Sequence, residues 1–64
     1  MSIETFYTDE FKMVVDPITY ADQNQVSVVI TLYPSEISAG GIADTQLAAL
    51  RIALDALALK GRVK

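Results

Sequence analysis

With 64 residues, the chain is long enough for one small domain, and a domain of this size buries only about 60% of its extended surface. It contains no cysteine and no histidine, so disulfides are excluded and a zinc site is not expected, which leaves self-association as the usual source of extra stability. The net charge is −3, and the acids concentrate in residues 1–44, which speaks against general nucleic-acid binding through phosphate neutralisation.

The first half of the chain predicts short antiparallel strands. Residues 2–8 are β-prone and predict a first strand, Asp9-Glu10 predicts a turn, and residues 11–20 predict a second strand. Residues 25–33 give the clearest strand pattern, with alternating apolar and polar side chains. A four-residue loop over 21–24 would place Val15 opposite Ile30. In that register the apolar side chains of both strands share one face: Phe11, Met13, Val15, Pro17, Val26, Val28, Ile30 and Leu32.

Two prolines and a glycine pair are expected to interrupt the sheet. Pro17 has no N–H group, so we predict that the strand ladder breaks or bends at Asp16-Pro17. Pro34 ends the third strand because its ring cannot continue a ladder. Residues 37–41 are then predicted to form a connecting loop that is flexible at Gly40-Gly41.

Residues 42–60 predict the single helix, because Ala and Leu dominate and neither Gly nor Pro interrupts them. Asp44 is expected in the first turn or at the N-cap, and Gly61 just past the helix end. One apolar arc is interpreted as the core stripe: Ala43, Leu47, Leu50, Leu54 and Leu57.

A second apolar arc lies nearly opposite on the helix: Ala48, Ala49, Ile52, Ala56 and Leu59. One small sheet covers only one side of a helix, so we predict that this second arc is a self-association interface. The alternative is that Ala is simply a good helix former and that the second arc faces water.

Together these elements predict a single α+β domain over residues 1–64: a two- to three-stranded antiparallel meander followed by one C-terminal helix, in a homodimer. Asp44, Arg51 and Asp55 break the apolar run too often for a membrane span. The first ten residues have neither a basic region nor an apolar core, so no signal peptide is expected. The predicted location is the cytoplasm, or the host cytoplasm if the protein is viral.

No residue pattern points to catalysis, a cofactor or a metal. Without His and Cys the common bases and thiolates are missing, and Ser35-Glu36 is typical of a turn. Gly40-Gly41 precedes the helix, but no G-x-G-x-x-G pattern and no following Lys accompany it, so a phosphate site is not indicated. We predict no catalytic, cofactor-binding or metal-ligating residue, and a protein that is not an enzyme.

The sequence therefore favours a small non-enzymatic protein-protein interaction module that is an obligate homo-oligomer. Its build, a tiny acidic sheet and one helix in a dimer, is similar to that of some small viral and prophage proteins. This suggests a phage-type inhibitor or accessory protein that binds a basic site on a host protein. The surface predicted to face that partner is acidic: Glu4, Asp9, Glu10, Asp16 and Asp22.

Two other functions remain open at this stage. One is a virion or assembly subunit whose basic C-terminal tail, residues 60–64, contacts nucleic acid. The other is an enzyme whose pocket forms between protomers.

Overall fold

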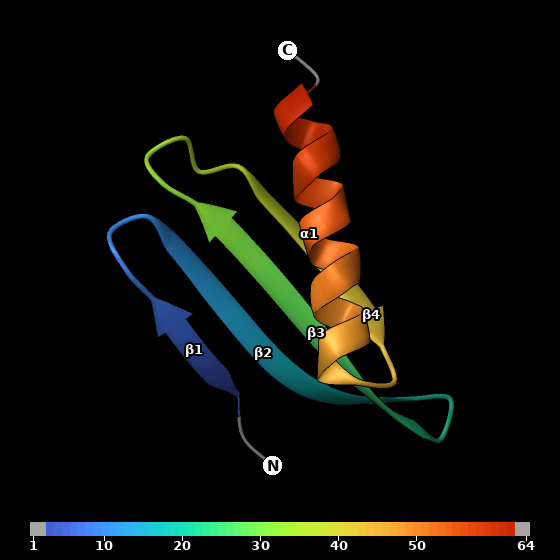
Figure 1. The fold of residues 1–64 in the computed structure, drawn as a ribbon. Coiled ribbons are helices and arrows are strands. Elements are labelled where there is room, and N and C mark those ends of the chain that lie inside the picture. The colour runs from blue at the N-terminus through green and yellow to red at the C-terminus, as the bar shows by residue number, and fades with distance from the viewer. Residues whose placement is uncertain (1–2, 63–64) are drawn as a thin grey trace.

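The computed structural model describes residues 3–62. The elements, in chain order, are β1 (Glu4–Tyr7), β2 (Phe11–Tyr20), β3 (Gln23–Leu32), β4 (Ser38–Ala43) and α1 (Gln46–Arg62). The strands form one antiparallel sheet in the order β1-β2-β3-β4, and α1 lies across one face of it (Figure 1). The predicted α+β class, antiparallel sheet and C-terminal helix are confirmed. The sheet has four strands, however, rather than two or three.

Ala21 and Asp22 form a two-residue turn between β2 and β3, with φ angles of 52° and 62°. Positive φ at both central residues is the backbone of a type I′ hairpin turn. The predicted four-residue loop is therefore wrong, and Val15 lies opposite Val28 rather than Ile30. Because side chains alternate with a period of two, a register shift of two residues leaves each side chain on its face. The predicted apolar face of β2 and β3 is formed.

Replacing this turn by Asn-Gly, through Ala21→Asn and Asp22→Gly, is expected to raise the free energy of unfolding by about 1–2 kcal/mol. Asn and Gly adopt positive φ with less steric strain than Ala, whose Cβ approaches the backbone there. Urea unfolding followed by far-UV circular dichroism, at one protein concentration, measures the change. A lower unfolding midpoint in the variant would contradict the turn type.

Pairing between β2 and β3 continues through Pro17, so the ladder has no break at Asp16-Pro17. β2 does curve toward its end (Figure 1). The Tyr33 N–H donates to the Glu10 carbonyl at 2.8 Å. Ladder bonds alternate along an antiparallel pair, so this bond places the nitrogen of Pro17 on the side away from β3. On that side β2 pairs with β1, and the described pairing ends at Val15, two residues before Pro17. The missing N–H therefore costs no bond to β3.

Residues 38–43 form β4, so the predicted loop over 37–41 is wrong for most of its length. Gly40 and Gly41 are paired strand residues rather than a hinge, and Gly41 lies opposite Val28. The Leu32 N–H donates to the Ile37 carbonyl at 2.8 Å. By the same alternation, every second residue of β4 directs its N–H and C=O away from β3, toward the free edge of the sheet: Ser38, Gly40 and Ile42. The Nζ of Lys60 donates to the Ser38 carbonyl.

α1 begins at Gln46 and is capped by Thr45, whose Oγ1 accepts a hydrogen bond from the Ala48 N–H at 3.2 Å. The predicted start at Ile42 and the predicted role of Asp44 in the first turn or cap are wrong, because β4 runs to Ala43 and Asp44 precedes the cap. The helix runs through Gly61 to Arg62, and Gly61 has no positive φ. The glycine is therefore not the left-handed residue beyond the helix that was predicted.

The core lies between α1 and the sheet and consists mainly of small side chains. Its buried members are Val15, Val28, Ile30, Ala39, Ala49, Ala53 and Leu57. The helix sits very close to β4, because a Cβ built on Gly41 would lie 2.5 Å from the Ala49 carbonyl oxygen. A residue without a Cβ at position 41 is needed for this approach.

The buried stripe of α1, Ala49-Ala53-Leu57, runs between the two predicted apolar arcs. Two corrections follow. Leu47 and Leu54, which were predicted to belong to the core, are 68% and 50% exposed. Ala49, which was predicted to mediate self-association, is completely buried within its own subunit.

Candidate interaction surface

A groove of about 280 Å³ lies between α1 and the sheet, and only apolar side chains line it: Phe11, Met13, Ile30, Leu32, Leu50, Leu54 and Leu57. Its helical wall is formed by leucines at three- and four-residue spacing, which places them on one flank of α1. Its floor is formed by residues of β2 and β3 whose side chains alternate onto the α1 side of the sheet. A groove without polar atoms has nothing with which to orient a polar substrate.

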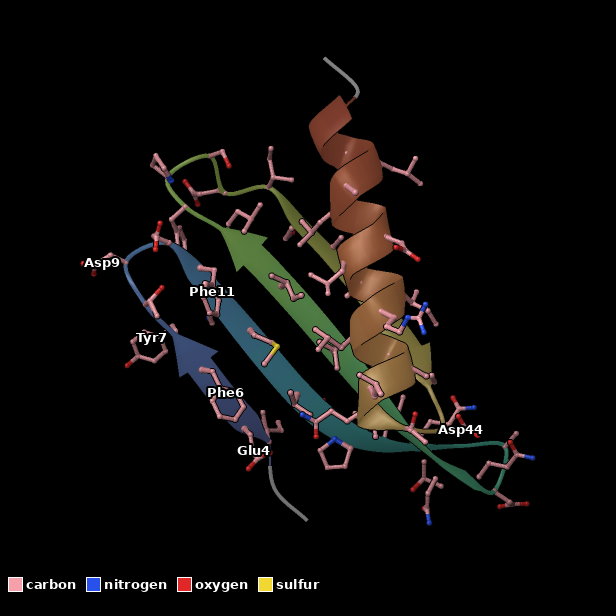
Figure 2. All side chains as sticks on the ribbon, in the orientation of Figure 1. Glu4, Phe6, Tyr7, Asp9, Phe11 and Asp44 are labelled. Atoms are coloured by element: carbon pink, nitrogen blue, oxygen red, sulfur yellow. The ribbon has the colours of Figure 1, made fainter. Side chains whose placement is uncertain are left out.

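The groove opens onto a half of the sheet that α1 does not cover. The helix packs mainly against β4 and β3; Val15 of β2 still lies in the core, but β1 and the Phe11 end of β2 stay open (Figure 1). Phe6 of β1 pairs with Met13, so it shares the face of Phe11, and both rings lie on the α1 side of the sheet (Figure 2). Phe6 is 46% exposed and Phe11 is 37% exposed. Aromatic side chains of this size are usually buried in a core or in an interface.

We call this surface the open apolar face. Its sheet half consists of Phe6, Phe11, Met13 and Leu32, and its helix half consists of Leu47, Leu50 and Leu54. The two halves meet at the groove. Contiguous apolar surface of this kind marks a binding site more often than scattered exposed residues do.

The structure separates the five residues predicted to form a self-association interface. Ala49 is buried, and Ala56 packs against the core. Ala48 is half-buried. Ile52 and Leu59 are exposed, but they lie on the flank of α1 away from the groove, and a Cβ on Gly41 would lie 2.7 Å from the Cβ of Ile52. These five residues do not form one exposed face.

The structure does not gather the predicted acidic surface either. Asp9 and Glu10 occupy the turn between β1 and β2, whereas Asp22 occupies the turn at the other end of β2, about 33 Å away along a ten-residue strand. Glu4 points to the α1 side of the sheet and Asp16 to the opposite side, as their register positions require. Only Asp9 and Glu10 remain a close acidic pair.

The basic tail, predicted as a possible nucleic-acid contact, is described only in part. Lys60 lies in α1 and donates to the Ser38 carbonyl, whereas residues 63–64 lie outside the described residues. Within residues 3–62, no group of three His, Cys, Asp or Glu side chains could hold a metal ion. No helix in the described part of the chain is long and apolar enough to span a membrane.

Sequence reasoning missed the sheet half of this surface. Phe6 and Phe11 were assigned to strands, but their exposure depends on how far one helix reaches across a four-stranded sheet. One sequence feature could have indicated the docking position of the helix: residues 39–41 are all small, and small side chains let a helix approach a strand closely. Comparison of the chain with models of protein families, with curated proteins and with solved structures found no match.

Proposed function

We propose that this protein is a small non-enzymatic protein-protein interaction module that acts as a homodimer, joined through the open apolar face. The observation that carries the proposal is that α1 packs mainly on β4 and β3, whereas Phe6 of β1 and Phe11 of β2, on the same side of the sheet, stay 46% and 37% exposed. The uncovered half of the sheet and the adjoining helix flank present large apolar side chains to water. Burying apolar surface is the dominant favourable term in most protein association.

The exposed area supports the same proposal. A folded monomer of 7.0 kDa is expected to expose about 4,040 Å², whereas this chain exposes 4866 Å². The excess of about 830 Å² is close to the roughly 800 Å² that each partner buries in an interface of standard size. This excess is of the size that burial in a specific dimer would remove from water.

The small core also favours a dimer. Among the described residues, the largest fully buried side chain is Val28. A chain of this size has little apolar surface to bury by itself, and it has no disulfide to compensate. Association would add the phenylalanines and leucines of the open apolar face to the buried set.

In this proposal the homodimer recognises another protein. The acidic pair Asp9-Glu10, at the turn between β1 and β2, is the part of the predicted acidic surface best placed to contact a basic site, because both residues are exposed and adjacent. An inhibitor or accessory role would use such a contact.

Leu32→Glu is expected to convert the dimer to a folded monomer and to raise the dissociation constant at least 100-fold. The substitution places a charge in the apolar face, and burying an unpaired carboxylate costs several kcal/mol. Sedimentation velocity over a concentration series measures the change, with circular dichroism to confirm the fold.

Val29→Glu is the matched control. Val29 lies in the same strand and is also 39% exposed, but its side chain lies on the opposite face of the sheet. This variant should dimerise like the parent protein. A parent protein that stays monomeric throughout the series, or a Leu32→Glu variant that still dimerises, would disprove the proposal.

A further inference from the structure

We infer that the occupant of the open apolar face is α1 of a second copy of this chain. Each helix then packs on its own β3 and β4 and also on the β1 and β2 strands of the partner. This inference rests on the proposed homodimer and adds the elements that meet in it.

The uncovered part of the sheet, β1 and the Phe11 end of β2, is about as wide as one helix. Strands lie about 4.8 Å apart, so two strands are as wide as a helix of about 10 Å diameter. α1 has 17 residues and is about 26 Å long, which is enough to cover the four residues of β1, about 13 Å, and to extend along β2 beyond them. Residues 3–62 contain no second helix to fill this place. A second copy supplies one of the right length.

The open apolar face is self-complementary, as a two-fold dimer requires. One half is a raised ridge, the leucine flank of α1, and the other half is the flat surface of β1 and β2. A two-fold rotation places the ridge of each copy on the flat half of the other. A surface that was only ridge or only flat would need a different partner.

The flank of α1 next to the groove is the one that faces the partner. Leu47 and Leu54 lie on this flank and are 68% and 50% exposed. Ile52 and Leu59 lie on the opposite flank, where Ile52 already contacts Gly41 of its own β4. One helix cannot present both flanks to the same sheet. The geometry therefore favours the leucine flank over the arc that the sequence suggested.

The charged residues at the rim of the open apolar face agree with this arrangement. In the described parts of β1 and β2, Glu4 is the only charged residue whose register position lies on the α1 side. Arg51 follows Leu47 by four residues and is exposed on α1. With the helix of one copy over β1 of the other, Arg51 at the border of the leucine flank can pair with Glu4. Asp55, four residues after Arg51, is also exposed but lies further round the helix from this flank.

Two charged variants, Phe6→Glu on the sheet half and Leu54→Lys on the helix half, test the arrangement. Each alone is expected to weaken dimerisation at least 100-fold, because both two-fold contacts then bury an unpaired charge. An equimolar mixture is expected to form a 1:1 heterodimer within tenfold of the parent affinity. In that heterodimer one contact pairs the introduced carboxylate with the introduced ammonium, and the other contact is unaltered. Native mass spectrometry distinguishes the species by mass.

Ile52→Glu is the control for the other flank, and it should leave dimerisation of the parent intact. A parent that dimerises while Ile52→Glu alone abolishes the dimer would overturn the arrangement and keep the proposed function. A mixture of folded variants that stays monomeric would overturn it as well. A monomeric parent would instead overturn the proposed function itself.

Disulfide trapping covers the case in which a charged variant fails to fold. The chain has no cysteine, so Phe6→Cys and Leu54→Cys in separate chains each introduce one thiol. Oxidation of their mixture is expected to give mainly the crossed disulfide dimer. If each variant instead links chiefly to itself, the helix of one copy does not lie on the sheet of the other.

Discussion

Gly41→Ala is expected to lower the free energy of unfolding by about 3 kcal/mol, the upper end of the range for overpacking a core. The added methyl would lie 2.5 Å from the Ala49 carbonyl oxygen and 2.7 Å from the Cβ of Ile52. The first of these atoms is backbone, so it cannot rotate away, and α1 must move off β4. Urea unfolding followed by circular dichroism measures the loss, at one protein concentration because the proposed dimerisation would make stability concentration-dependent.

Two other glycines provide controls for this substitution. A Cβ on Gly40 would lie 3.3 Å from its nearest neighbours, so Gly40→Ala should cost clearly less than Gly41→Ala. A Cβ on Gly61 would meet no atom within 4 Å, and Gly61→Ala should add about 0.5–1 kcal/mol by removing a glycine from a helix. Equal losses at positions 40 and 41 would show that the helix does not dock as closely as described.

Ala53→Leu is expected to have the second largest effect, a loss of about 2–3 kcal/mol. Ala53 is completely buried at the centre of the helix stripe, and the larger side chain has no space between α1 and the sheet. Ala58→Leu on the exposed side of the same helix should change stability by less than about 0.5 kcal/mol.

Both alanine variants are best compared in the Leu32→Glu background, where self-association does not contribute to stability. Urea unfolding with circular dichroism again gives the two values. If Ala58→Leu costs as much as Ala53→Leu, then the stripe Ala49-Ala53-Leu57 is not the side of α1 that packs on the sheet.

The strand faces could be predicted from the sequence because they depend only on a period of two. The apolar sides of β2 and β3 were placed correctly even though the register was wrong by two residues. The register itself depends on the turn. A two-residue turn at Ala21-Asp22 was hard to foresee because Ala is a poor residue for positive φ.

The side of the helix that packs on the sheet could not be predicted from hydrophobicity alone. Leucines are the obvious core candidates, but the sheet presents Ala39 and Gly41 to the helix, and at Gly41 the backbone of Ala49 itself comes close. β4 was missed for the same reason, since glycines are depleted in strands. Close approach of two backbones makes a stripe of mainly small apolar residues, rather than the leucine-rich flank, the buried side of α1.

The interaction surface could be predicted only in part. The sequence indicates that one helix with apolar residues on two sides has more to bury than one sheet can cover. It does not reveal which residues stay uncovered, because that depends on the four-stranded width of the sheet and on the place where α1 docks. Phe6 and Phe11 become surface residues only because the helix lies over β3 and β4.

The outward-facing backbone of β4 bears on whether assembly stops at two chains. The proposed dimer would still carry two β4 edges, and a second two-fold contact between such edges would join dimers into an open ribbon. β4 contains neither a charged residue nor a proline to discourage that pairing. The ammonium group of Lys60, bonded to the Ser38 carbonyl, is the positive charge held against this edge. If the protein dimerises as proposed, Lys60 would therefore oppose the further association of dimers through their β4 edges.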